Sequence, residues 1–200
     1  PWILGKFYAL IQRNPASNRA LFELADIAPN DRILDVGCGA GGALVLAAET
    51  ALQLGEIERA AEMASEIEGR YRSSPEGYRI AAEVAIQRKH LPEAAALLRQ
   101  AFELQPSSPL LLRRVSVLAS QGKAEAAAGA ALLEGWIKSN EGDVLARKAL
   151  AELRMLEGDW KAARRAYEEI VSRGLHDAGV LNNLANVLLE LKDPRALELA

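Results

Sequence analysis

The stretch that decides the fold is residues 75–106, PEGYRIAAEVAIQRKHLPEAAALLRQAFELQP. Its apolar and small residues recur three or four positions apart, which is the spacing of one face of an α-helix. That face consists of Tyr78, Ala81, Ala82 and Ala85, then Leu91, Ala94, Leu98, Ala101 and Leu104. Lys89-His90 separates the two runs, and Pro106 ends the second. The stretch therefore predicts two helices joined by a short turn.

The same hairpin pattern recurs along the chain. The expected turns are 34, 33, 36 and 34 residues apart, at Gly55-Glu56, Lys89-His90, Gly122-Lys123, Gly158-Asp159 and Lys192-Asp193. An alanine follows each turn, and in four units another precedes it: Ala60, Ala94, Ala127, Ala163 and Ala196, and Ala48, Ala82, Ala151 and Ala185. A larger side chain where two helices cross would push their axes apart. The alanines therefore predict close helix crossings.

This pattern closely resembles the tetratricopeptide repeat, a unit of two helices with a period near 34 residues. The resemblance covers about residues 43–200 and implies an all-α, right-handed superhelix of stacked helical hairpins. We expect units at 43–74, 75–107, 108–143 and 144–177 and a partial unit at 178–200. Trp160 and Tyr167 are expected to fill the core between stacked hairpins.

Residues 1–42 do not follow the repeat. SNRALFELADIA, residues 17–28, predicts a short helix, and RILDV, residues 32–36, predicts a strand before a glycine-rich loop. The string ILDVGCGAGG, residues 33–42, closely resembles the first motif of class I methyltransferases that use S-adenosylmethionine. That resemblance implies a βα fragment in which the cofactor would be held by Asp35, Gly37, Gly39 and Gly41.

The sequence after Gly42 does not continue such a domain. A second strand ending in an acidic residue should follow about 20 residues on. Glu56, Glu58 and Glu62 instead fall in a turn or helix of the repeat. One unpaired strand cannot form the crevice that would hold the cofactor. We therefore expect no catalysis and no cofactor; the alternative is a methyltransferase whose remaining strands lie outside this chain.

The junction between the two segments lies near Ala43. Residues 43–54 can serve as the helix after the glycine loop or as the first helix of the repeat, because both need one apolar face. We interpret the junction as a fusion of two unrelated segments. In another interpretation, residues 1–42 cover the outer face of the first hairpin, through Trp2, Ile3, Phe7 and Leu10.

Composition narrows the classes of partner and site. The formal net charge of −3 favours neither nucleic acid nor an anionic membrane. No apolar run reaches the roughly 18 residues of a membrane span, and no signal peptide is evident, so a cytoplasmic location is the default expectation. Cys38 is the only cysteine and His90 and His176 the only histidines, so we expect no disulfide, metal site or reactive thiol. The start at Pro1 indicates a piece of a longer chain.

The resemblance implies a protein or peptide partner bound on a concave surface. In LNNLAN, residues 181–186, Asn182 and Asn186 lie one turn apart and would line the peptide-binding groove, where amides can bond both N–H and C=O of a peptide. The second repeat, residues 75–107, would contribute Arg79 and Glu83, with Glu76 and Gln87. Alternatively, the asparagines only cap or solvate a terminal helix. The expected function is a protein interaction scaffold without catalysis, of unknown oligomeric state.

Overall fold

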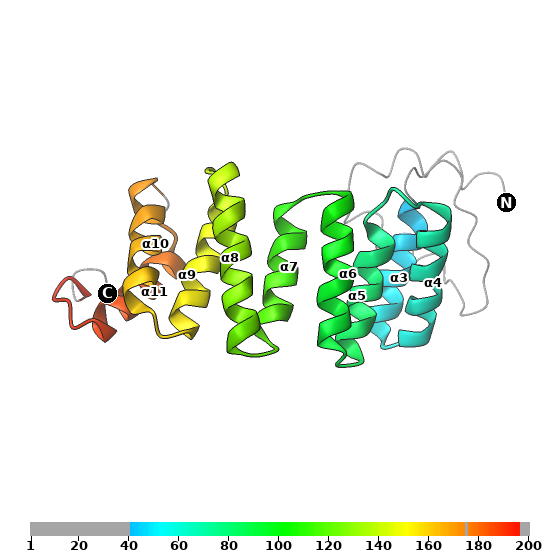
Figure 1. Cartoon of the computed structure of the whole chain (residues 1–200), viewed down its shortest axis with the longest axis horizontal. Helices are drawn as coiled ribbons and strands as arrows, with labels where there is room; N and C mark the ends of the chain where they lie inside the picture. The colour runs from blue at the N-terminus through cyan, green and yellow to red at the C-terminus, as the bar shows by residue number, and fades with distance from the viewer. Residues whose placement is uncertain (1–40, 175, 197–200) are drawn as a thin grey trace. The chain divides into compact units, whose positions relative to one another are not determined.

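The computed structural model describes residues 41–174 and 176–196. This part of the chain contains nine α-helices and no strand. The helices are α3 (Gly42–Leu54), α4 (Ile57–Arg70), α5 (Glu76–Gln87), α6 (Leu91–Leu104), α7 (Ser108–Ala119), α8 (Lys123–Ser139), α9 (Val144–Leu156), α10 (Trp160–Ser172) and α11 (Ala178–Glu190) (Figure 1). The predicted all-α helical repeat is therefore confirmed. The helix expected at 17–28 and the strand expected at 32–36 lie outside the described residues.

The chain divides into two compact units, Pro1–Val84 and Ala85–Ala200, with the division inside α5. In the first unit, α3, α4 and the first part of α5 pack through small residues. Two clusters form this core, Ala48, Ala64 and Ile80, and Ala51, Ala60 and Val84. Each of these residues is at most 3% exposed. The first unit is thus held by alanine contacts that bring the helix backbones close together.

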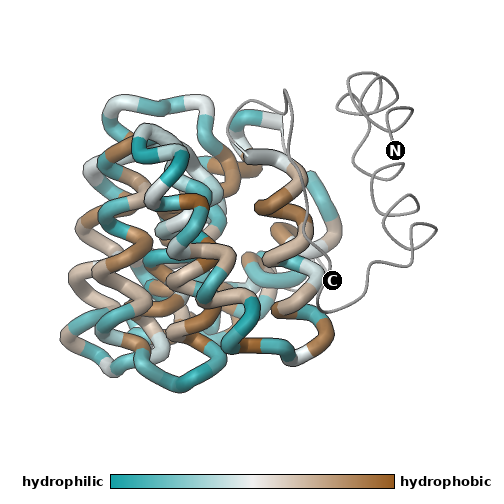
Figure 2. The backbone as a smooth tube through the Cα atoms, turned by 90° about the vertical axis from the view of Figure 1, so that its right-hand side faces the viewer, coloured by the Kyte–Doolittle hydropathy of each residue, from teal (hydrophilic) through white to brown (hydrophobic). Residues whose placement is uncertain are grey.

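The second unit has two larger clusters that share α9. The first consists of Leu111, Val115, Ala126, Ala130, Leu133, Ile137, Ala146 and Leu153, from α7, α8 and α9. The second consists of Ala151, Ala163, Tyr167, Ile170, Val180, Leu184, Val187, Leu188 and Ala196. Hydrophobic and hydrophilic residues alternate along the helices in Figure 2, as expected for helices that bury one side. Because α9 contributes to both clusters, it joins one hairpin to the next.

The predicted alanines are buried, with one exception. Ala127 is exposed, and the buried position in α8 is Ala126. The reason is the preceding turn: α8 begins directly after Gly122, whereas α4 begins two residues after Gly55. The buried face of α8 therefore starts one residue earlier than the repeat predicts. The prediction for Ala127 was wrong by one position.

Four of the five predicted turns share one hydrogen-bonded geometry. The backbone N–H of the second turn residue donates to the carbonyl five residues earlier, as in Glu56 to Ala51 at 2.8 Å and His90 to Ala85 at 2.8 Å. The first turn residue is left-handed in each case: Gly55 (φ 77°), Lys89 (φ 63°), Gly158 (φ 78°) and Lys192 (φ 56°). This Schellman geometry closes the first helix and reverses the chain. The turn positions follow from the sequence period.

A substitution of Lys89, the left-handed residue of the second turn, tests the turn geometry. Its left-handed conformation costs an L residue about 1 kcal/mol, which glycine avoids. We expect Lys89→Gly to raise the free energy of unfolding by about 0.5–1 kcal/mol in urea denaturation. Lys161→Gly, the same change at an exposed helical position of α10, should lower it by about as much. A destabilised Lys89→Gly variant would contradict the account of the turn.

At Gly77, α5 approaches α4 closely. A Cβ atom there would lie 2.8 Å from the backbone N of Glu68 and 2.5 Å from its Cγ. We therefore expect Gly77→Ala to lower the free energy of unfolding by about 1–3 kcal/mol. Gly69 has open space around it, so Gly69→Ala should be neutral or stabilising by up to about 1 kcal/mol. Equal effects of the two changes, measured by urea denaturation, would exclude a close approach at Gly77.

Candidate ligand-binding surfaces on α9 and α11

Aspartate caps fix the start of α9, α10 and α11. The side chain of Asp143 accepts a hydrogen bond from Ala146 N at 3.0 Å, and that of Asp177 accepts one from Val180 N at 2.9 Å. Asp159 caps α10 in the same way. Each cap satisfies a backbone donor that would otherwise lack a partner. The side chains on these helices are thus presented on a defined backbone.

α11 presents two predicted asparagines to solvent. Its buried side consists of Val180, Leu184, Ala185, Val187 and Leu188. Asn182 and Asn186 are exposed and four residues apart, which places them one turn apart on the same side. Neither amide has a hydrogen-bond partner among the described residues. We call these two residues the asparagine pair.

Asn183, between them, has a different role. Its Nδ2 donates to the hydroxyl of Tyr167 at 2.9 Å. Tyr167 is fully buried, and burial raises the pKa of its hydroxyl to about 12, against the opposing effect of the Asn183 hydrogen bond and with a contribution from Glu152. The predicted core role of Tyr167 is confirmed, and Trp160 packs, partly buried, against the same cluster. The side chain of Asn183 therefore stabilises the packing of α11 against α10.

The exposed side of α9 was not singled out by the sequence analysis. Leu145, Lys148, Glu152 and Leu156 follow one another at three- and four-residue steps and so lie along one stripe of the helix. Leu145 is 62% exposed and Leu156 is 80% exposed. Among the described residues, Lys148 and Glu152 form no ion pair. We call these four residues the α9 stripe.

Two observations place the stripe beside α11. The Nζ of Lys148 lies 3.4 Å from where a Cβ on Gly179 would be. The charge of Glu152 acts on Tyr167, whose hydroxyl is bound to Asn183 of α11. The sequence carries a signal for the stripe, since its four residues recur at helical spacing. They lie on the side of α9 away from its buried residues, which are Ala146, Arg147, Ala151 and Leu153.

Arg79 and Glu83 lie in the first unit, on α5. The Nε of Arg79 donates to Glu76 at 2.6 Å, and its Nη2 pairs with Glu49 of α3. Burial lowers the pKa of Arg79, but the two carboxylates outweigh it and raise the pKa above its ordinary value. Arg79 thus ties α5 to α3. Glu83 is half-buried, and the role of this pair in ligand binding stays a prediction.

The predicted cofactor residues Asp35, Gly37 and Gly39 lie outside the described residues, as does Cys38. Gly41 is described: it precedes α3 with φ 78°, and a Cβ there would lie 2.5 Å from the ring of Tyr71. A residue with a side chain would therefore collide with the Tyr71 ring at position 41, so packing explains the glycine there. Binding of S-adenosylmethionine stays a prediction of the sequence.

Three further features could indicate a function within the described residues: the two histidines, a group of metal ligands, and a membrane-spanning helix. His90 and His176 are exposed, and the Nδ1 of His90 lies 3.4 Å from Glu93. Within 41–174 and 176–196, no three His, Cys, Asp or Glu side chains are grouped so as to hold a metal ion. None of the described helices is both long enough and apolar enough to span a membrane.

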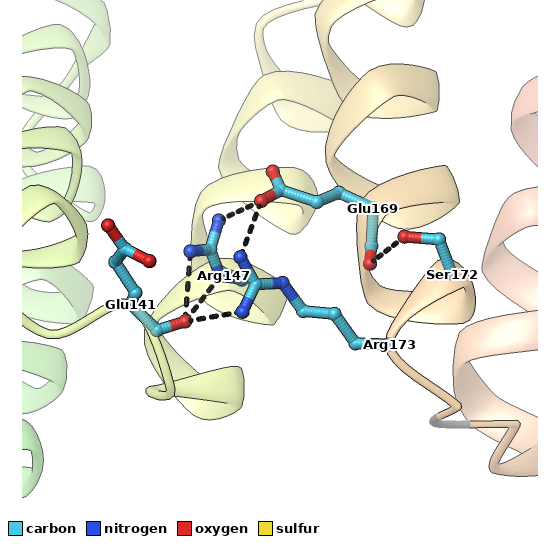
Figure 3. Close-up of polar contacts among 5 residues, drawn as sticks. All are labelled: Glu141, Arg147, Glu169, Ser172 and Arg173. Carbon is cyan, nitrogen blue, oxygen red and sulfur yellow. Dashed lines mark hydrogen bonds and ion pairs between the residues drawn. The ribbon is translucent and has the colours of Figure 1, made fainter.

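A buried arginine lies at a cavity of about 220 Å³ formed by α8, α9 and α10. Arg147 is 7% exposed; its Nη2 donates to the Glu141 carbonyl at 2.9 Å, and its Nη1 pairs with Glu169 at 2.6 Å (Figure 3). Arg173 donates to the same two groups at 3.0 and 3.2 Å. These donors tie the loop before α9 to α10. No local sequence pattern signals this network, because Arg147 and Glu169, which join its two halves, are 22 residues apart in the chain.

Comparison with known proteins agrees with this geometry. Residues 45–109 match the tetratricopeptide repeat family model. A thermophilic tetratricopeptide repeat protein of Thermus thermophilus is 26% identical, with a TM-score of 0.61 over 92% of this chain and 94% of that chain. MamA of Desulfovibrio magneticus RS-1 is 14% identical, with a TM-score of 0.62 over 82% and 93%. No curated protein is matched by sequence.

A third similar structure is YrrB, described as a tetratricopeptide repeat protein with an unusual peptide-binding site. It is 18% identical, with a TM-score of 0.57 over 78% of this chain and 80% of that chain. Together with the paired helices and their turns, these likenesses define the fold class: the described residues form a helical repeat of the tetratricopeptide type, and residues 45–109 match the family model itself.

The ionisation of Tyr167 tests the packing of α10 against α11. A tyrosine in the unfolded chain ionises near pH 10, whereas Tyr167 ionises at about 12 in the folded chain. The stabilising contribution of the buried neutral hydroxyl is thus complete below pH 10 and declines as the pH rises to 12. We expect the unfolding free energy of the wild type to fall relative to Tyr167→Phe over this interval, by up to about 3 kcal/mol. Parallel pH profiles of the two proteins would contradict the burial of this hydroxyl.

Proposed function

We propose that this chain is a protein interaction scaffold, without catalysis of its own, in which the asparagine pair binds an extended segment of a partner protein. The observation that carries the proposal is the difference between neighbouring asparagines of α11. Asn183 is bonded to Tyr167, whereas Asn182 and Asn186 are exposed and without partners among the described residues. A rigid helix thus presents two amides that are not used to hold the fold.

Asparagine amides suit a peptide backbone because each has a carbonyl acceptor and an NH₂ donor. Two amides one turn apart are about 6 Å from each other, close to the repeat of two residues in an extended peptide. The pair can therefore bond backbone groups that point to the same side of the peptide. Since backbone groups are common to all sequences, these bonds supply affinity, and neighbouring side chains supply specificity.

The likeness to YrrB supports this class of function, because that protein is described as having a peptide-binding site. The repeat array supports it as well, since stacked hairpins bind through extended surfaces. In the first unit, Arg79 and Glu83 are a second predicted contact for the same class of partner. Their part in binding is secondary in the proposal, because Arg79 is already held by Glu49 and Glu76.

The test begins with a peptide selected on the whole chain from a random phage-displayed library. Its Kd is then measured by calorimetry for the wild type and for Asn182→Ala/Asn186→Ala. We expect the double variant to bind about tenfold or more weakly, because two to four amide hydrogen bonds are lost at about 0.5–1.5 kcal/mol each. Helix content, measured by circular dichroism, should not change.

Gln100→Ala is the matched control, since it removes an exposed amide from α6. The control should bind the selected peptide as the wild type does. Equal affinity of the wild type and the double variant would exclude the asparagine pair as the site. A library that yields no binding peptide would count against the peptide-binding function itself.

A further inference from the structure

The α9 stripe exposes two leucines on either side of two charges that have no ion-pair partner among the described residues. Its order along the helix is Leu145, Lys148, Glu152 and Leu156. Of the five large hydrophobic residues that are exposed in the described part of the chain, two are these leucines. The neighbouring arginine of α9, Arg154, is paired with both Glu134 and Glu157. Lys148 and Glu152 therefore stand out in α9 as charges without an ion-pair partner among the described residues.

The stripe is complementary to itself when it is reversed. Leu145 and Leu156 are 11 residues apart, or about 16 Å along the helix. If a second copy of α9 lies antiparallel, each Leu145 faces Leu156 of the other copy. The same register brings Lys148 of each copy close to Glu152 of the other. Every member of the stripe then meets a residue of matching chemistry, as a two-fold symmetric interface requires.

The side chains of the stripe are long enough for this contact. Helices pack with axes about 8–10 Å apart. The stems of lysine and glutamate span this gap, so Lys148 of each copy can reach Glu152 of the other.

We propose that a second copy of this chain docks on the α9 stripe, which makes an antiparallel α9–α9 contact across a two-fold axis. This site shares no residue with the asparagine pair, which lies on the neighbouring helix α11. A single helix pair buries less than the roughly 1,200 Å² of a standard stable interface, so the dimer is weak and forms with rising concentration. The two ion pairs make it sensitive to salt.

The test is the mass of the whole chain by sedimentation equilibrium between about 5 and 500 µM at low salt. We expect the average mass to rise from the monomer mass of 21.6 kDa towards twice that value. Lys148→Glu and Glu152→Lys each turn both ion pairs of the dimer into contacts between like charges. Each variant should therefore weaken dimerisation about tenfold. The double variant restores opposite charges and should return to within about threefold of the wild type.

Two leucine variants complete the design. Leu156→Ser should weaken the dimer, whereas Leu104→Ser, which changes an exposed leucine on α6, should leave it unchanged. A chain that is monomeric at every concentration would overturn the proposal. So would a dimer that both charge reversals leave intact, or a double variant as weak as the single ones. Asn182→Ala/Asn186→Ala should dimerise as the wild type does.

Discussion

The structure depends on the close crossing of helices over alanine. Ala48, Ala60, Ala94, Ala151 and Ala163 are each completely buried, and no larger side chain would fit at these crossings without moving the helices apart. Since alanine itself buries little apolar area, stability comes from the larger side chains that the close approach brings together, such as Leu98, Leu133 and Ile170. The alanines set the geometry and the larger residues supply the energy.

This division of roles explains which surfaces remain for binding. In the second unit, α9 contributes Ala146 and Leu153 to one cluster and Ala151 to the other. α9 and α11 still have one side each that the clusters do not use. The buried Arg147 and the Asn183–Tyr167 bond fix these helices from within. The exposed residues can therefore vary in chemistry without loss of the fold.

The sequence predicted the features that depend on local patterns. The helix pairs and the turns at Gly55, Lys89, Gly158 and Lys192 follow from periodicity, and their left-handed residues lie where the period placed them. Ala127 was misplaced because the turn at Gly122 passes into α8 one residue sooner, which a fixed repeat cannot show. The exposure of Asn182 and Asn186 agrees with helical spacing, whereas their role in binding is a proposal. Contacts between residues far apart in the chain could not be predicted: Glu49, 30 residues from Arg79, holds its guanidinium, while the role of Arg79 in ligand binding stays a prediction. The ion pair of Arg147 with Glu169 likewise joins two helices, and no local pattern identifies it.

The central claim is that the fold is held by one side of α11 and that a ligand uses the other. Amide chemical-shift mapping of the chain with a selected peptide tests it most directly. The account predicts the largest shifts at the side-chain NH₂ groups of Asn182 and Asn186, with the Asn183 group still bonded to Tyr167. Shifts centred on the cavity at Arg147, with the α11 amides unchanged, would contradict it.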